Sequence, residues 1–261
     1  MCLIIFDWQP SQKHILTLAS NRDEFHNRPS LDAHYWEDQP HIYGGRDLKE
    51  NGTWLAVSKH NRFAAVTNYR SPETGSFQRS RGEIPSQFLC SKLSAAEFSS
   101  TLSERKYAGY NALLFDGIQL IYCTNRDSKD DITFKHRIEI LTPGKYGLSN
   151  HLLNTPWHKV KRTKPALDEL HNFSENKDIA SHLLTALQDV EHAKDEDLPS
   201  TGINKSLETL WSSAFISGPN YGTRTSTVII MSKNESYVQE RQYRGERCQF
   251  KEQSEHVYLL D

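Results

Sequence analysis

The chain has 261 residues, of which 36% are hydrophobic and 25% charged, and its formal net charge is −2. This length and composition allow a sizeable hydrophobic core, in one large domain or two small ones. With only 13 Gly and 10 Pro, the composition argues against a fibrous or disordered chain. Acidic and basic residues are mixed along the sequence, so we expect no binding to nucleic acid or to an anionic membrane surface.

No segment has the pattern needed for membrane insertion or secretion. No apolar run approaches the roughly 20 residues that cross a bilayer, and the N-terminus lacks a basic segment followed by a long apolar stretch. The four cysteines are scattered and form no CxxC pair, which argues against a disulfide framework or a structural zinc site. We therefore expect a cytoplasmic protein with no integral membrane segment and no bound metal.

The chain opens with two apolar runs of strand length, residues 1–6 and 14–24, on either side of a turn-rich segment. This pattern predicts a β-hairpin, in which antiparallel partners lie about 5 Å apart. The hairpin would bring Cys2 beside the polar cluster that ends the second run, Asn21-Arg22-Asp23-Glu24.

Further along, β-rich runs alternate with two helical regions. Residues 31–43 and 71–82 are expected to be loops, and Ser94 starts a capping-box pattern that predicts a helix. Pro165 is expected to kink a helix over 155–173 or to start a second one. Other helices are expected at 179–190 and 203–210, a loop at 217–224, and strands at 53–58, 62–68, 110–115, 118–123, 132–150, 227–231, 237–243 and 256–260.

Hairpins outnumber βαβ units in this order, which predicts an α+β protein with mainly antiparallel sheets covered by helices. No composition shift marks a boundary, so we expect one domain over residues 1–261.

Cys2 is the first candidate for chemistry. A residue this small at position 2 permits removal of the initiator Met, which would leave a cysteine with a free α-amine. That amine has an ordinary pKa of about 7.7–8.0 and a thiol about 8.5, so one residue would carry both nucleophile and base. The alternative is a small buried hydrophobe at the start of a strand.

The charges that follow the second apolar run are costly unless they are paired or solvated. Asp23 is a candidate to orient the amine, and Arg22 to bind a substrate carboxylate or lower the thiol pKa. Adjacent strand residues point to opposite faces, so Arg22 and Asp23 are not expected to face the same site, and Arg22 is the weaker candidate. An ordinary ion-paired strand end is the alternative.

Three further strand ends are polar: Asn68, Asn150 and Arg224. An Asn amide is a suitable donor to a tetrahedral oxyanion, and an Arg binds an anion or a thiolate. Each of these residues singly is also compatible with a turn or a strand cap. Their repeated position at strand ends favours a constructed site.

These motifs together resemble the NRDE family, also called the transport and Golgi organisation protein 2 family. The resemblance covers nearly the whole chain and rests on Cys2, Asn21-Arg22-Asp23-Glu24, Gly45-Arg46-Asp47, Gly52-Thr53-Trp54-Leu55, Thr67-Asn68-Tyr69-Arg70, Leu148-Ser149-Asn150 and residues 222–227. It implies the fold of the N-terminal nucleophile (Ntn) hydrolases, a four-layer αββα sandwich with two mainly antiparallel sheets.

Within that superfamily the chain is similar to the bile-salt hydrolase and penicillin V acylase group, which cleaves non-peptide amides with an N-terminal Cys. The resemblance implies a Cys2 amidohydrolase that acts on a small-molecule C–N bond without a cofactor. In those enzymes the early Arg precedes its Asp by several residues, whereas Arg22 and Asp23 are adjacent here. The implied catalytic residues are Cys2, Asp23, Asn68, Asn150 and Arg224, and the implied substrate-binding residues are Asn21, Arg22, Arg46 and Trp54.

The resemblance also implies an alternative without catalysis, an intracellular protein that binds and traffics haem or serves lipid and acyl-CoA homeostasis. The sequence has no CxxCH attachment motif. Its 12 His residues supply axial ligands, and its aromatic residues supply walls for an apolar ligand, although a His is far more often a surface or core residue and most aromatic residues are core or loop anchors. A scaffold protein without chemistry is a third alternative. The residues concerned are His14, His26, His151, His158, Trp36, Tyr43, Trp54, Tyr69 and Trp157.

Overall fold

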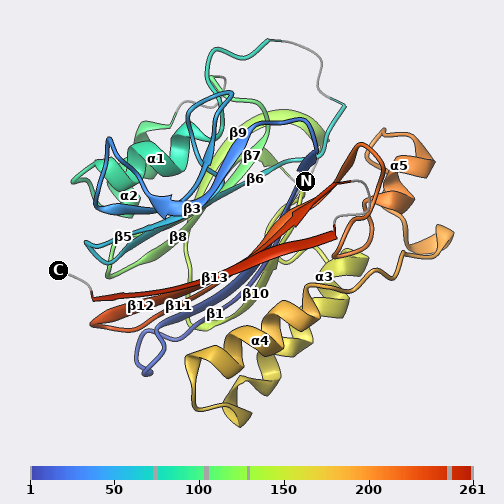
Figure 1. Ribbon diagram of the computed structural model, residues 1–261. Helices are drawn as coiled ribbons and strands as arrows, with labels where there is room; N and C mark the ends of the chain where they lie inside the picture. The colour runs from blue at the N-terminus through green and yellow to red at the C-terminus, as the bar shows by residue number, and fades with distance from the viewer. Residues whose placement is uncertain (1, 73–75, 103–105, 128–129, 246–248, 260–261) are drawn as a thin grey trace. The chain divides into compact units, whose positions relative to one another are not determined.

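The computed structural model describes residues 2–72, 76–102, 106–127, 130–245 and 249–259 (Figure 1). These residues form two compact units. The first unit contains the residues up to Asn27, Pro143–Ser149 and Leu153–Leu259, and the second contains Arg28–Thr142 and Asn150–Leu152. The single domain over residues 1–261 stays a prediction.

The first unit is built on an antiparallel sheet with the strand order β10-β1-β2-β11-β12-β13. The hairpin predicted at the start of the chain lies inside this sheet, since β1 pairs with β2 and both have a further neighbour. The strands are β1 (Cys2–Trp8), β2 (Leu16–Phe25), β10 (Gly144–Leu148), β11 (Tyr221–Met231), β12 (Glu235–Arg244) and β13 (Gln249–Leu259).

Helices cover one face of this sheet, as Figure 1 shows for α3 and α4. The helical segments are α3 (His158–Thr163), the 3₁₀ helix η1 (Lys164–Asn172), α4 (Asn176–Ala186), the 3₁₀ turn η2 (Asp195–Asp197) and α5 (Lys205–Leu210). Pro165 lies in the first turn of η1, where its missing N–H is tolerated, so it starts a second helix as predicted. The core between sheet and helices includes Leu3, Ile5, Leu183 and Val228.

The second unit is an antiparallel meander in which each strand pairs with the next along the chain. Helices α1 (Glu83–Cys90) and α2 (Ala95–Thr101) pack on it, and Phe88 and Phe98 belong to its core. The strands are β3 (Ser30–Tyr35), β4 (Ile42–Asp47), β5 (Leu55–Ser58), β6 (Arg62–Asn68), β7 (Tyr110–Phe115), β8 (Leu120–Asp127) and β9 (Asp130–Ile140).

Two local predictions of the second unit are confirmed. Ser94 accepts a hydrogen bond from the Glu97 backbone N–H while the Glu97 carboxylate accepts one from the Ser94 N–H, so the capping box starts α2. The strands predicted at 110–115 and 118–123 correspond to β7 and β8, which pair, and the turn between them uses Gly117 at φ +95°, a conformation that favours glycine.

Other local predictions are wrong. Residues 31–43 are not a surface connection, because β3 and the start of β4 lie there and Pro40 falls between them. The loop predicted over 217–224 ends earlier, because β11 begins at Tyr221 and pairs with Phe25. Helix α1 was not predicted as a separate element, and its Pro85 lies in the first turn, where the missing N–H is tolerated. Of the loop predicted over 71–82, residues 73–75 lie outside the described residues.

The α+β class with two mainly antiparallel sheets and helices is therefore confirmed. Within the described ranges, no helix combines the length and the apolar character that crossing a membrane requires.

Candidate functional site

Cys2 is the first residue of β1 and lies directly opposite Arg22 on β2. It is half-buried, whereas the four residues that follow it are buried. Its carbonyl oxygen accepts a hydrogen bond from the Ser149 hydroxyl at 3.0 Å. The thiol is free, and its position at the end of a central strand of the first unit holds it in one place while leaving it partly accessible.

The register separates the polar cluster at the end of β2 into two faces. Leu3 and its partner Asn21 face the helices, so Cys2 and its partner Arg22 point to the opposite face. Asp23 points to the helix side, where it meets Lys159 of α3. Arg22 and Asp23 therefore diverge as their adjacency predicts, and Arg22 is the one that shares the face of the thiol.

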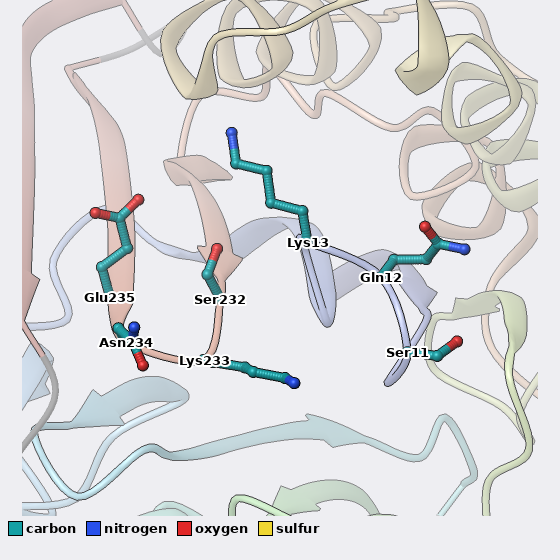
Figure 2. A pocket seen from close by; sticks show the side chains of 7 residues that line it. All are labelled: Ser11, Gln12, Lys13, Ser232, Lys233, Asn234 and Glu235. Atoms are coloured by element: carbon teal, nitrogen blue, oxygen red, sulfur yellow. The ribbon is translucent and has the colours of Figure 1, made fainter.

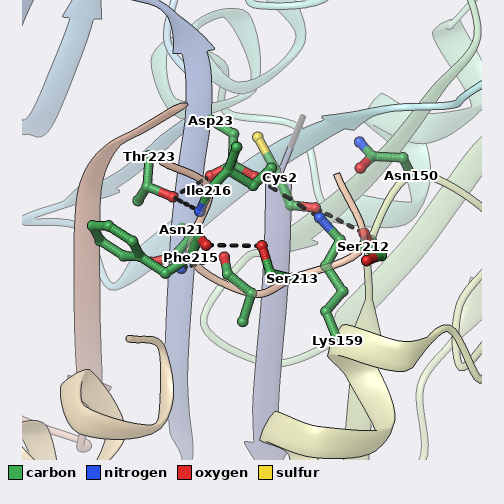
Figure 3. A network of polar contacts seen from close by, with 12 residues as sticks. Cys2, Asn21, Asp23, Asn150, Lys159, Ser212, Ser213, Phe215, Ile216 and Thr223 are labelled. Carbon is green, nitrogen blue, oxygen red and sulfur yellow. Dashed lines mark hydrogen bonds and ion pairs between the residues drawn. The ribbon is translucent and has the colours of Figure 1, made fainter. Parts of the chain in front are cut away.

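The Asp23 carboxylate is enclosed by polar groups of the first unit (Figure 3). Oδ1 accepts a hydrogen bond of 2.8 Å from the Thr223 hydroxyl, and Oδ2 lies 3.9 Å from Nζ of Lys159. Burial raises the pKa of the Asp23 carboxyl, and the charge of Lys159, the hydrogen bond from Thr223 and the charge of Arg22 act against that rise. The site thus holds a carboxylate at one place behind the end of β1.

Burial also raises the pKa of the Cys2 thiol, and the negative charge of Asp23 adds to this effect. The Arg22 guanidinium and a hydrogen bond from the Asp23 backbone lower the same pKa. The net direction is upward, so the thiol is protonated at neutral pH. A reaction that uses this thiol as a nucleophile needs a base beside it.

Asn21 anchors the end of β2 rather than facing solvent. Its amide nitrogen donates to the carbonyl oxygens of Leu187 and Ala214, at 2.9 and 2.8 Å, and its amide oxygen accepts from the Ser226 hydroxyl. A fully buried side chain with these three bonds fixes two loops against the sheet. Its implied contact with substrate stays a prediction.

Arg224 lies in a β-bulge, because the pairing of β11 with β2 shifts between Thr223 and Thr225. Its Nη1 donates to the carbonyl oxygens of Phe25 and His26, at 3.0 Å each. Bulges re-aim a side chain, and this one turns the guanidinium onto the backbone where β2 ends. Its implied role in holding charge at the site stays a prediction.

The remaining implied site residues belong to the second unit. Asn150 donates to the Asn68 carbonyl oxygen at 3.0 Å, so these two lie together at the end of β6. Arg46 forms a bidentate ion pair with Asp38, and its guanidinium lies 4.4 Å from the centre of the Trp36 ring. Trp54 covers Gly45, where any Cβ would meet its ring at 2.3 Å. Their implied catalytic and binding roles stay predictions.

Two residues of this site are absent from the sequence-based candidates. Lys159 and Thr223 hold Asp23, yet Lys159 falls in a basic helix of ordinary composition and Thr223 in a segment predicted as a loop. The one sequence pattern that could have indicated a strand at Thr223 is the alternation of Thr223, Thr225 and Thr227. Nothing in the sequence distinguishes Lys159 from Lys161 beside it.

A separate groove joins the turn after β1 to the turn after β11 (Figure 2). Its volume is about 500 Å³, and it is open and polar. The turn follows the seven residues of β1, so the groove lies ~20 Å from Cys2 at the other end of the strand. It is therefore not the site of Cys2. Its lining residues are Ser11, Gln12, Lys13, Ser232, Lys233, Asn234 and Glu235.

A comparison with protein families gives a match over residues 1–245 to the family described as Transport and Golgi organisation 2. The chain belongs to that family. Curated relatives carry the same name: the mouse homolog (Mus musculus) is 34% identical over 257 residues, covering 90% of each chain. The human homolog (Homo sapiens) is 34% identical over 254 residues, covering 88% of each, and the protein of Drosophila melanogaster is 27% identical over 269 residues, covering 94% of this chain and 93% of that one.

Solved structures show which fold this Transport and Golgi organisation 2 family member has. The Caenorhabditis elegans ortholog of N-acylethanolamine-hydrolyzing acid amidase is similar with a TM-score of 0.51 at 10% identity, covering 88% of this chain and 92% of that one. A mutant of the conjugated bile acid hydrolase from Clostridium perfringens gives a TM-score of 0.53 at 9% identity, covering 100% and 97%. The predicted resemblance to Ntn hydrolases is thereby confirmed at the level of the fold.

Proposed function

We propose that this protein is a hydrolase of small-molecule, non-peptide amides that uses Cys2 as its nucleophile. The observation that carries the proposal is the position of Cys2, half-buried at the first residue of a central strand, with Arg22 directly opposite. The fold of the two solved amide hydrolases supports it. The proposal requires removal of Met1, which lies outside the described residues.

The base for the thiol is the α-amine that Met1 removal would expose. In an antiparallel pair, the nitrogen of Cys2 lies on the side of the next residue of β2, which is Asp23. The Asp23 carboxylate would orient the amine, and the amine would take the proton of the thiol directly or through a water. This proton transfer forms the thiolate, which the raised pKa of the Cys2 thiol otherwise disfavours at neutral pH.

The thiolate would then attack the carbonyl carbon of the amide and push one electron pair onto the oxygen. Collapse of this oxyanion breaks the C–N bond, and the leaving nitrogen takes the proton held by the α-amine. The product is a thioester on Cys2, which water attacks with its proton passing to the same amine. The C–S bond breaks, the thiol regains its proton, and a carboxylic acid leaves. Asn68 or Asn150 as oxyanion donors, and Arg224 as a charged group, stay predictions within this scheme.

The names of the two solved structures suggest a substrate class. One hydrolyses N-acylethanolamines and the other conjugated bile acids. In both cases the name describes an acyl group joined to a small polar partner. We propose the same chemical class, an acyl amide of a small polar amine, for this chain.

Intact mass and covalent labelling test this proposal. We expect the purified protein to lack Met1 and to gain the mass of one whole lactone molecule on incubation with a β-lactone that bears an acyl chain, because attack by the thiolate opens the ring and leaves a thioester on Cys2. Cys2→Ala should also lose Met1 yet remain unlabelled, and Cys90→Ala, which removes an exposed thiol, should be labelled as the parent is. Retention of Met1, or labelling of Cys2→Ala, contradicts the mechanism.

Haem binding is the alternative that the family resemblance implies, and the described pockets of the first unit do not favour it. The groove at Ser11–Lys13 is polar and contains no His, Cys or Tyr. The pocket beside His14 has a volume of only about 240 Å³, below the ~300–1,000 Å³ of ordinary ligand sites. A third pocket of this unit, with a volume of about 300 Å³ beside Pro156 and Pro165, is also lined by no His, Cys or Tyr. A haem titration with no Soret shift would rule out this candidate.

A further inference from the structure

The strongest observation that the mechanism leaves unused is a lysine buried inside the first unit. Lys159 belongs to α3, and its side chain is only 1% exposed. Lysine is almost never fully buried unless its charge is paired. Its ammonium lies 3.9 Å from Oδ2 of Asp23, whose side chain is 0% exposed, and Figure 3 shows the side chain reaching from the helix toward Cys2 and Asp23.

Stability alone does not account for such a pair. Burying two charges costs several kcal/mol per ion, and replacing a buried ion pair with apolar residues is often neutral or stabilising. We therefore look for a functional role that requires the charges of this pair.

The other oxygen of the same carboxylate is fixed from β11. Thr223 donates its hydroxyl to Asp23 Oδ1 and accepts the Ile216 backbone N–H, at 2.8 and 2.9 Å. The Thr223 backbone in turn donates to the Ile216 carbonyl oxygen. The carboxylate is thus held from two sides, by an uncharged hydroxyl and by the charged lysine.

We propose that Lys159 is a positioning residue of the Cys2 site, whose ammonium keeps the Asp23 carboxylate charged and fixed beside the backbone nitrogen of Cys2. The lysine touches neither the thiol nor the substrate in this scheme, and it acts through Asp23. The catalytic consequence rests on the proposed hydrolase function, because only an amine at Cys2 needs an oriented carboxylate. The effect of Lys159 on Asp23 does not rest on it.

The charged side chains that act on Asp23 include Lys159 on α3 and Arg22 on β2, and the charge of Asp23 acts in turn on the Cys2 thiol of β1. Burial raises the pKa of the Asp23 carboxyl, and Lys159 is the strongest opposing influence. An opposite charge at this range lowers a carboxyl pKa by about one to three units. Without the lysine, the carboxyl loses that stabilisation of its charged form.

Carboxyl ¹³C NMR on labelled protein tests the proposal without any substrate. In Lys159→Met we expect the titration midpoint of Asp23 to rise by about one to three pH units, and in Lys159→Arg to stay near that of the parent. The control is Lys161→Met, on the same helix and exposed, which should leave the midpoint unchanged. An unchanged midpoint in Lys159→Met, or an equal rise in the control, overturns the proposal.

A second measurement separates positioning from a purely structural role. The pH profile of Cys2 alkylation, followed by mass, should be the same in Asp23→Asn and in the double variant Lys159→Met with Asp23→Asn, because the lysine acts only through the carboxylate. A difference between these two profiles overturns the proposal. Alkylation needs no turnover, so a protein that hydrolyses nothing still gives a clear answer.

The double variant also covers a failure of Lys159→Met to fold. Removing one partner of a buried pair leaves an uncompensated charge, whereas removing both charges does not. If Lys159→Met unfolds and the double variant folds, the lysine is needed for the charge of Asp23, as proposed. If both unfold, Lys159 is a packing residue and the proposal is wrong.

Discussion

The triplet Asn-Arg-Asp ends a strand in both units, and the two copies differ in what surrounds them. In the first unit it is Asn21-Arg22-Asp23 at the end of β2, and in the second it is Asn125-Arg126-Asp127 at the end of β8. Each strand is the second of a hairpin, with β1 before β2 and β7 before β8. The same three residues therefore occupy corresponding places, but only Arg22 has a half-buried cysteine as its cross-strand partner. The cysteine of the second copy, Cys123, lies on β8 itself two residues before Asn125 and is fully buried.

The asparagines behave alike. Asn125 accepts the Tyr110 backbone N–H and donates to the carbonyl oxygens of Tyr107 and Ala108, just as Asn21 binds two carbonyl oxygens of distant loops. Both side chains are 0% exposed. In both copies, the Asn side chain therefore binds irregular backbone segments to the end of a strand.

The arginines and aspartates differ. Arg126 is fully buried, lies 3.9 Å from the centre of the Phe134 ring, and packs on Gly109, where a Cβ would meet its Nε at 2.7 Å. Arg22 instead has Cys2 as its cross-strand partner. Asp127 forms a partly exposed ion pair with Lys135, whereas Asp23 is enclosed with Lys159. The triplet builds a strand end, and a thiol and a buried lysine around one copy make it a candidate for chemistry.

Replacing the asparagines tests the part of the comparison in which the copies agree, and the largest effect is expected here. Asn125→Ala leaves a buried N–H and two carbonyl oxygens without this partner, at about 1–3 kcal/mol for each unsatisfied group, so we expect a loss of at least about 3 kcal/mol. Asn21→Ala should lose a similar amount. Urea unfolding measures both, and a loss in only one copy would show that the two asparagines are not equivalent.

Replacing Asp23 tests the part in which the copies differ. Burial raises the pKa of Asp23 above its ordinary value of 3.8, so the folded protein binds a proton more tightly than the unfolded chain does. Its contribution to stability is therefore fully present below that value and is lost as the pH rises through the pKa of the folded state. Each unit of the rise corresponds to about 1.4 kcal/mol.

In the double variant Asp23→Asn with Lys159→Met, which removes both charges of the buried pair, this loss of stability with rising pH should disappear. Urea unfolding at a series of pH values from acid to neutral measures the slope. Asn carries no charge at any pH, and it keeps a group that accepts from the Thr223 hydroxyl. The Asp23→Asn substitution should lower the pKa of the Cys2 thiol, because the negative charge that raises it is gone. If the slope of the free energy of unfolding against pH and the thiol pKa are both unchanged, the buried charge of Asp23 has no electrostatic effect on stability or on Cys2.

Much of the second-unit meander and the opening hairpin was predictable, because their signals are local. Alternating apolar residues and turn residues such as Asp116-Gly117 specify neighbouring strands, and the capping box at Ser94 specifies a helix start. The pairing of β2 with β11 was not predictable, since about 200 residues separate their partners and no local pattern encodes such a distance. That pairing brings Thr223 to Asp23.

The site was predictable to the same extent. Because adjacent residues of a strand point to opposite faces, the sequence alone predicts that Arg22 and Asp23 diverge. It does not say which of them faces the thiol, because that depends on register, and here Arg22 does. Lys159 reaches Asp23 only through the packing of α3 on the sheet, which the sequence does not reveal. The second triplet, by contrast, is visible in the sequence together with Cys123 two residues before it, and only the structure shows that this thiol is buried in the core of the second unit.

The smallest effect is expected for Asp127→Asn, and it completes the comparison with Asp23. The Asp127 carboxylate lies 3.0 Å from Nζ of Lys135, whose side chain is 60% exposed. Such a pair gains little Coulomb energy in water and costs side-chain entropy, so the change should lower the free energy of unfolding by less than about 1 kcal/mol.

Added salt should reduce even that difference, since ~0.15 M salt screens exposed charges beyond about 8 Å and weakens those nearer. Urea unfolding of Asp127→Asn at low and high salt measures it, with Lys135→Met as the matched change on the other partner. A loss of several kcal/mol, or a loss that salt does not alter, would show that the Asp127 pair is shielded from solvent like the pair of Asp23 and Lys159. The contrast between the two copies of the triplet would then have to rest on the thiol alone.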